Sequence, residues 1–376
     1  MKRAIQLVAF NVPYPPDYGG VIDIFYKVKA LSECGVLIDL HCFEYDRPQT
    51  IELEKYCAKV FYYTRKEGIR YQFSIQPYIV VTRANDQLLK NLSSSNAPIL
   101  FEGLHTCFYL DHPLLTNHIK LVRTHNVEHD YYKNLYKSEQ HLFKRIYFKL
   151  EAYKLSVYES ILKKASQLLC ISPNDFDYFN QKYGHSHLIP AFHPFNEIKS
   201  KVGHGKYILF HGNLSVGENI HAVEYLLVQV FSKINFPVIV AGKNPTAGLT
   251  EKINQYPHVE LVSNPLNGQM ETLIQDAQLC ILPTFQDTGI KLKLLASLFS
   301  GRFCIANTPM IHNTGLEHLC ALADTPKEMI DVIEELFHQD FTSEEIAHRK
   351  LILEDDFSNR RNALKIIQLI DDIATG

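Results

Sequence analysis

The sequence predicts two doubly wound α/β domains, and three observations lead to this prediction. The chain has 376 residues, which is more than one core of about 100–200 residues usually encloses. Hydrophobic residues make up 46% and charged residues 21% of the chain, a composition typical of a packed globular protein. Short apolar runs alternate with segments of helical length, which is the pattern of βαβ units and a mostly parallel sheet.

The first half of the chain contains six candidate strands. Each is a run of a few apolar residues, the length expected of a buried strand in a parallel sheet. Several of the intervening segments are long enough for a crossover helix. The six runs cover residues 4–10, 37–44, 60–64, 98–103, 119–126 and 167–172.

The second half restarts the same pattern. Residues 219–234 place Val223, Leu226 and Val230 on one stripe, so we expect a helix that packs on a sheet. Residues 357–376 have the pattern of one more amphipathic helix. The candidate strands of this half cover residues 207–213, 237–243, 259–263, 279–284 and 303–308.

A linker is expected at residues 189–206, where two prolines, two glycines and several charges follow the last strand of the first half. We therefore predict a first domain over residues 1–195 and a second over residues 196–376.

Charge and cysteine content limit the partners and the compartment. Lys and Arg number 38 and Asp and Glu 41, and the net charge of −3 gives no reason to expect a nucleic-acid partner. The eight cysteines form no C-x-x-C pair and the N-terminus lacks a signal-peptide pattern, so we expect a cytoplasmic chain with reduced thiols. No run approaches the about 18 apolar residues that cross a bilayer, so any membrane contact should be peripheral.

Two loops of the first half carry candidate functional residues. Ligands of open parallel sheets bind beyond the carboxyl ends of the strands. Gly19 and Gly20 open a helix after the first strand, where paired glycines either let the backbone approach a phosphate or form a simple tight turn. His125 and Asn126 end the fifth run and Glu128 begins the next helix. A strand-end imidazole can hydrogen-bond a sugar or move a proton near neutral pH.

The sharpest signal of the second half is the segment PTFQDTGIKLK, which follows the strand at 279–284. Lys291 and Lys293 begin the next helix, where cations are unfavourable unless an anion is bound. We predict a diphosphate there, and a solvated pair of charges is the alternative. Weaker candidates end the first two strands of this half, namely Gly212, Asn213 and Lys243.

Several classes of enzyme lack their motif in this sequence. G-x-x-x-x-G-K-[ST], H-E-x-x-H, clustered Cys/His ligands and G-x-S-x-G are absent, which disfavours P-loop phosphoryl transfer, a built-in zinc site and a hydrolase elbow.

Taken together, these segments resemble the retaining glycosyltransferases of family 4, which have the GT-B fold. The likeness covers nearly the whole chain and rests on PYPPDYGG, RTHNVE, LEAYKLSVYES before CISPNDFDYF, FHGNLSVGEN, VAGKNP and PTFQDTGIKLKLLASLFSG, in this order. It implies two facing Rossmann-like domains and a last helix that crosses back to the first domain. It also implies a nucleotide-diphosphate-sugar donor on the second domain, an acceptor on the first, and no metal or other cofactor.

The resemblance also assigns roles. Gly19 and Gly20 would lie near the pyrophosphate and the transferred sugar, and His125 would be the catalytic residue that contacts this sugar. Asn213 falls where the family often has a phosphate-binding Arg, whose charge Lys291 or Lys293 would supply. The remaining candidates are Gly212, Lys243, Thr288 and Gly289 for the donor, and Asp17, Asn126 and Glu128 for the acceptor.

One departure from the family affects the expected activity. The family's Glu-x7-Glu carboxylates would fall at Thr288 and Ala296, and Ala296 cannot hold the donor ribose. Thr288 and the Gly289 amide can still bind a sugar or phosphate, and Asp287 is adjacent. A binding or scaffold protein without catalysis, and a nucleotide-sugar epimerase of the same shape, therefore stay open as alternatives.

We expect transfer of a hexose-type sugar, with retention, to a hydroxyl of a glycan or lipid-linked acceptor in surface polysaccharide or glycan biosynthesis. Such enzymes often work at the inner face of a membrane. The basic and aromatic cluster FKRIYFK at residues 143–149 suits peripheral docking, although we favour the simpler interpretation that it is the solvated face of a long helix.

Overall fold

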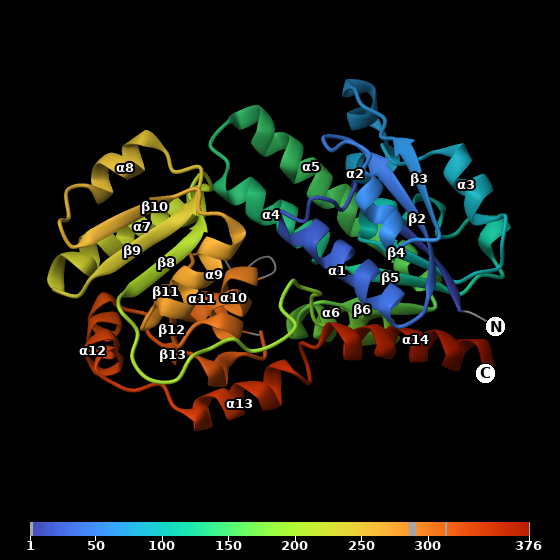
Figure 1. Cartoon of the computed structure of the whole chain (residues 1–376). Coiled ribbons are helices and arrows are strands. Elements are labelled where there is room, and N and C mark those ends of the chain that lie inside the picture. The colour runs from blue at the N-terminus through green and yellow to red at the C-terminus, as the bar shows by residue number, and fades with distance from the viewer. Residues whose placement is uncertain (1–2, 286–290, 313, 376) are drawn as a thin grey trace. The chain divides into compact units, whose positions relative to one another are not determined.

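The structure is a computed structural model that describes residues 3–285, 291–312 and 314–375. The chain forms two compact units (Figure 1). Unit 1 contains Met1–Pro194 and Phe357–Gly376, and unit 2 contains Phe195–Asp287 and Lys291–Asp356.

The core of unit 1 is a parallel sheet with the strand order β3-β2-β1-β4-β5-β6-β7. All six strands expected from the sequence are present, and the short β7 is an addition. The order reverses between β1 and β4, and ligands of such sheets bind beyond the carboxyl ends at this point. The strands are β1 (Ala4–Ala9), β2 (Leu37–Glu44), β3 (Lys59–Thr64), β4 (Ile99–Glu102), β5 (Lys120–Thr124), β6 (Gln167–Cys170) and β7 (Ser186–Leu188).

Helices cover the sheet of unit 1, and one of them comes from the end of the chain (Figure 1). Ala363, Ile366 and Ile367 of this last helix are buried in the same hydrophobic cluster as residues of the first helix. Arg3 and Asp371 pair at 2.7 Å beside it. The helices are α1 (Gly19–Glu33), α2 (Tyr78–Val81), α3 (Asp86–Leu92), α4 (Glu128–Ser138), α5 (Leu142–Tyr158), α6 (Pro173–Tyr183) and α14 (Asn359–Thr375).

Unit 2 repeats this topology with a parallel sheet in the order β10-β9-β8-β11-β12-β13, which reverses between β8 and β11. The helix expected at 219–234 is α7, which ends at Gln229 and is followed by a 3₁₀ turn at Phe231–Lys233. The strands are β8 (Ile208–Asn213), β9 (Val238–Lys243), β10 (Val259–Ser263), β11 (Leu279–Leu282), β12 (Phe303–Ala306) and β13 (Ala321–Leu322). The helices are α7 (Gly217–Gln229), α8 (Ala247–Ile253), α9 (Asn267–Asp276), α10 (Leu292–Ser300), α11 (Thr308–Ile311), α12 (Pro326–Phe337) and α13 (Ser343–Leu353).

None of the helices in the described part of the chain combines the length and the apolar character that crossing a bilayer requires.

Candidate functional site

The glycine pair of unit 1 lies where the sequence places it, at the first turn of α1. The helix begins at Gly19 after Tyr18, whose side chain makes no capping hydrogen bond. A Cβ atom on Gly20 would come within 2.7 Å of the Phe10 ring, so a larger residue at position 20 would displace this ring. Asp17, in the same loop, pairs with Arg47 at 2.8 Å.

A fully buried cluster of charges lies beneath this edge of the sheet. The ammonium of Lys27 lies 2.7 Å from Asp23 and 2.9 Å from Glu102. Arg123 donates to both carboxylate oxygens of Asp23, at 3.2 and 2.9 Å, and the backbone N–H of Phe192 donates to Asp23 at 2.8 Å. Burial alone would raise the pKa of Asp23, but the cations Arg123 and Lys27 outweigh it and hold this pKa far below its ordinary value.

His125 connects this cluster to the edge of the sheet. Its Nε2 atom lies 3.0 Å from Oε2 of Glu102, and its side chain is 7% exposed. The Phe10 ring meets the imidazole edge-on at 5.4 Å between centroids. Nδ1 is buried and has no hydrogen-bond partner among the residues that the structure describes. Because a carboxylate beside Nε2 favours the proton on that nitrogen, Nδ1 of the neutral ring can accept a hydrogen bond or a proton.

Asp23, Glu102 and His125 also form the one group in the described residues whose donor atoms are close enough together to hold a metal ion, within 4.8 Å of one another. Both carboxylates already pair with buried cations. A divalent ion would therefore meet the charges of Lys27 and Arg123 at close range. We interpret the group as an internal ion network rather than as a metal centre.

Glu128 is the second titratable group at this edge. It is the first residue of α4 and is buried, and burial, aided by Asp175, raises its pKa to about 8. Oε1 of Glu128 lies 3.7 Å from Nδ1 of His105, and neither atom has a hydrogen-bond partner within the described ranges. Glu128 and Asn126 both line a cavity of about 10 Å³, which is the size of one water molecule. Asp17 is not among the residues that line it.

Replacing Glu128 tests whether its buried carboxyl makes the stability of the protein depend on pH. The pKa of Glu128 rises from 4.5 in the unfolded chain to about 8 in the folded protein, so folding favours the protonated carboxyl. The contribution of protonated Glu128 to the free energy of unfolding is therefore complete below about pH 4.5 and is lost as the pH rises through about 8. Glu128→Gln should remove this dependence and raise the stability at pH 8 by about 4 kcal/mol. Thermal unfolding between pH 5 and 8, followed by circular dichroism, measures the effect. Exposed Glu334→Gln is the control, and an unchanged pH profile for Glu128→Gln would contradict the assignment.

In unit 2, the candidate residues gather at the ends of β8 and β9. Gly212 and Asn213 end β8, and Lys243 ends β9 with its side chain exposed. A Cβ atom on Gly242 would run into the carbonyl oxygen of Gly212, so the two strands require glycine there for close packing. Oδ1 of Asn213 accepts hydrogen bonds from the N–H and hydroxyl of Ser215, which fixes the loop before α7.

The two lysines lie at the start of α10, as the sequence predicts. Lys291 is the N-cap residue and Lys293 lies in the first turn. Lys293 donates to Oδ1 of Asn219 at 3.0 Å and lies over the Phe210 ring at 5.5 Å from its centroid. Burial lowers the pKa of Lys293 to about 8, with a raising contribution from Glu218 and a lowering one from Lys291. A desolvated ammonium at a helix N-terminus is suited to binding an anion.

Sequence reasoning missed three residues that surround these lysines. Asn219 and Glu218 lie in the first turn of α7, and Glu218 accepts a hydrogen bond from the Thr284 hydroxyl after β11. A signal existed, because polar residues begin the helix that follows the first strand of the domain. Thr288 and Gly289 lie outside the described residues. Ala296 lies in α10 beside Ser297, whose hydroxyl meets Nε2 of His211 at 2.8 Å.

Comparison with known proteins supports the fold. No family model matches the chain. A Klebsiella pneumoniae protein described as an uncharacterized 44.6 kDa protein in the cps region is 27% identical over 334 residues, 84% of this chain and 85% of that protein.

Solved structures align over almost the whole chain. A glycosyltransferase from Rickettsia africae is 13% identical with a TM-score of 0.66, covering 99% of both chains. A UDP-glucosyltransferase from Polygonum tinctorium is 11% identical with a TM-score of 0.57, again covering 99% of both chains. Arabidopsis thaliana UGT89C1, complexed with UDP, is 11% identical with a TM-score of 0.58, covering 98% of this chain and all of that one. The chain therefore has the GT-B fold, which confirms the fold class predicted from the sequence.

Proposed function

We propose that the protein is a glycosyltransferase that moves a sugar from a nucleotide-diphosphate donor to a hydroxyl acceptor, with retention, in polysaccharide or glycan biosynthesis. The observation that carries the proposal is the partly desolvated ammonium of Lys293 in the first turn of α10, with Lys291 beside it. The GT-B fold, the UDP bound to the Arabidopsis protein and the relative from a cps region support it.

The proposed donor site would act by stabilising the negative charge of the diphosphate. As the sugar leaves, negative charge grows on the diphosphate, and fixed cations and N–H groups stabilise this charge without reorganising. Lys291, Lys293 and the first amides of α10 would serve this purpose, and Gly212, Asn213 and Lys243 would line the donor site. No metal or other cofactor is needed for this role. Thr288 and Gly289 complete the proposed donor set.

The groups of unit 1 would act on the sugar and the acceptor. The His125 imidazole would contact the sugar while Glu102 supports its Nε2 atom, and the amides at Gly19 and Gly20 lie at the same edge of the sheet. Asn126, Glu128 and Asp17 would contact the acceptor, which we propose to be a glycan or a lipid-linked glycan rather than a nucleic acid. We place the reaction on the cytoplasmic side of a membrane.

Thermal-shift screening against UDP, GDP, ADP and their sugars tests the proposal. A donor present at 100 times its Kd adds about 2.7 kcal/mol of stability, which corresponds to a rise in Tm of about 5–10 °C for a domain of this size. The rise should grow with ligand concentration. AMP, which lacks the second phosphate, is the matched control and should give a much smaller rise.

Other outcomes separate the alternatives. If no nucleotide raises the Tm of the well-folded protein, a binding or scaffold role without a donor replaces the proposal. A donor that binds and is converted without an acceptor would indicate an epimerase. Release of the nucleotide diphosphate only in the presence of a hydroxyl acceptor would support transfer.

A further inference from the structure

The outer face of α5 carries an apolar stripe that nothing in the described chain covers. Leu142, Ile146, Leu150, Tyr153 and Val157 follow one another at intervals of three or four residues and are all exposed. At 100° per residue they fall within about 80° of the helix circumference. Glu151, Ala152 and Leu155 face the opposite way and are buried. The helix is therefore apolar on the side that faces solvent as well as on part of the side that faces the core.

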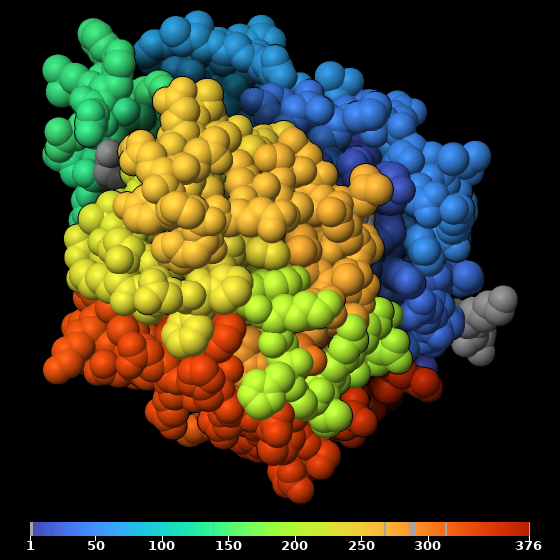
Figure 2. Space-filling model, turned by 60° about the vertical axis from the view of Figure 1, so that its left-hand side comes forward, coloured from blue at the N-terminus to red at the C-terminus, as the bar shows by residue number. Residues whose placement is uncertain are grey.

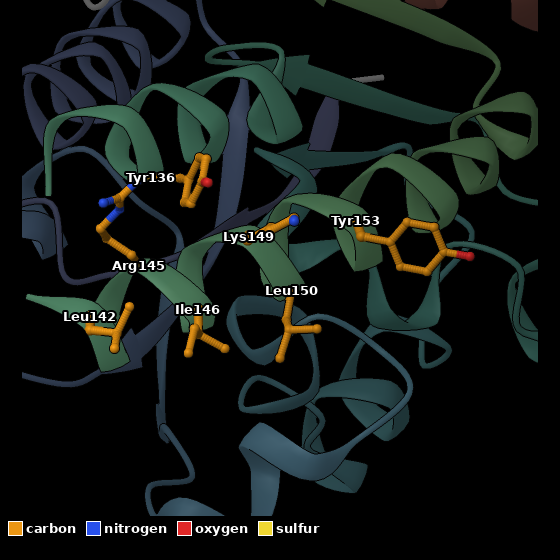
Figure 3. A pocket seen from close by; sticks show the side chains of 7 residues that line it. All are labelled: Tyr136, Leu142, Arg145, Ile146, Lys149, Leu150 and Tyr153. Atoms are coloured by element: carbon orange, nitrogen blue, oxygen red, sulfur yellow. The ribbon is translucent and has the colours of Figure 1, made fainter.

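The stripe borders a hollow with a volume of about 660 Å³. Figure 3 shows Leu142, Ile146 and Leu150 side by side along α5, with Tyr136 of α4 and Arg145 at one end and Tyr153 at the other. Phe143, which is 78% exposed, extends the apolar area. Figure 2 shows the green segment of α4 and α5 at the surface of the molecule.

A second exposed apolar group adjoins α5. Phe73 is 82% and Ile75 is 94% exposed, at the end of the 3₁₀ turn Ile69–Phe73 and just after it. Lys154 of α5 donates to the carbonyl oxygen of Gln72 at 2.7 Å, which holds this loop against the helix. The apolar surface therefore extends from α5 onto a neighbouring loop.

The charges around the stripe are mostly positive, which favours a negatively charged partner. α5 contains Lys144, Arg145, Lys149 and Lys154, and its single acidic residue, Glu151, is buried and paired with Lys154 at 2.8 Å. This local excess of positive charge contrasts with the net charge of −3 of the whole chain. By the same 100° rule, Lys149 and Arg145 lie along one flank of the stripe, so a cationic edge borders the apolar surface.

We infer that the outer face of α5 docks on a membrane surface rich in anionic lipid. Apolar side chains enter the boundary between headgroups and acyl chains, Lys and Arg pair with the lipid phosphates, and Tyr153 suits the polar boundary. A second copy of this chain fits less well, because an antiparallel pairing of two such faces would bring the Lys149 and Arg145 flanks of the two molecules together. This docking does not depend on the proposed transfer reaction, so the two can fail separately.

Vesicle flotation tests the inference. The full chain should float with vesicles of equal parts phosphatidylcholine and phosphatidylglycerol, and not with phosphatidylcholine alone. Leu150→Asp should reduce the bound fraction about tenfold, because it places a carboxylate in the apolar layer and adds a charge of the wrong sign. Leu351→Asp, at a 75% exposed position of α13 in unit 2, adds the same charge and should leave binding unchanged.

Fluorescence locates the docking face independently. The chain has no tryptophan, so Tyr153→Trp and Leu351→Trp each create a single reporter. The emission of Tyr153→Trp should shift to the blue with the anionic vesicles and be quenched by brominated lipid, and that of Leu351→Trp should not change. Failure of the chain to float, equal loss of binding in both Asp variants, or an analytical ultracentrifugation dimer that Leu150→Asp dissociates would each overturn the inference.

Discussion

Asp23→Ala is expected to destabilise unit 1 by about 3–5 kcal/mol, the cost of removing one partner from a buried charge network. The substitution leaves Arg123 without its carboxylate and Lys27 with Glu102 alone, and all of these side chains are fully buried. It also removes the acceptor of the Phe192 N–H. Urea unfolding of the full chain, followed by circular dichroism, measures the loss as a lower midpoint.

The surface pair Arg3–Asp371 provides the matched control for this prediction. Arg3→Ala breaks an ion pair of the same length, 2.7 Å, whose side chains are 60% and 35% exposed, and it should cost no more than about 1 kcal/mol. The low pKa of Asp23 adds a pH test, because its stabilising contribution is present above the unfolded pKa of about 3.8 and is lost as the pH falls below it. A midpoint for Asp23→Ala as close to the parent as that of Arg3→Ala would refute the network's role.

The double substitution Lys291→Ala and Lys293→Ala should weaken nucleotide-diphosphate binding at least about 100-fold, since hydrogen bonds to charged groups contribute about 1.5–3 kcal/mol each. Titration calorimetry with the nucleotide found in the thermal screen measures the change. The double variant of the exposed lysines, Lys327→Ala and Lys350→Ala, removes the same charge elsewhere on unit 2 and should bind normally. Equal affinity in the two double variants would remove these lysines from the site.

The lowered pKa of Lys293 should make nucleotide-diphosphate binding depend on pH. Burial lowers this pKa to about 8, and only the protonated amine attracts a diphosphate, so affinity should fall as the pH rises above about 8. The single variant Lys293→Ala should show a flat profile between pH 7 and 9.5. A parent profile as flat as that of the variant would show that Lys293 does not touch the anion.

The fold could be predicted because its signals are local. Eleven apolar runs mark eleven of the strands, and the stripe at 219–234 marks α7. β7 and β13 could not be found in this way, since Ser186–Leu188 and Ala321–Leu322 are too short to show a periodic pattern. α7 ends earlier than its apolar stripe, because the chain turns into a 3₁₀ helix at Phe231 while Ile234 still packs into the core.

The candidate site could be predicted only in part. Strand ends and helix starts located His125, Glu128 and the two lysines. The network around Asp23 was missed because charged residues are ordinarily assigned to the surface. Two features of the sequence point to the network. One is an Asp–Lys pair four residues apart on the apolar side of α1, and the other is the presence of the charged residues Glu102 and Arg123 within buried strands.

The position of α14 has a consequence for biosynthesis. During translation, the strands of unit 1 leave the ribosome well before α14, the helix that completes their core. The two segments of unit 2 lie between these strands and α14 in the sequence, so unit 2 can finish folding earlier. Until α14 emerges, the apolar groups of α1 that it will cover are open to water, and a nascent chain halted before α14 would expose them.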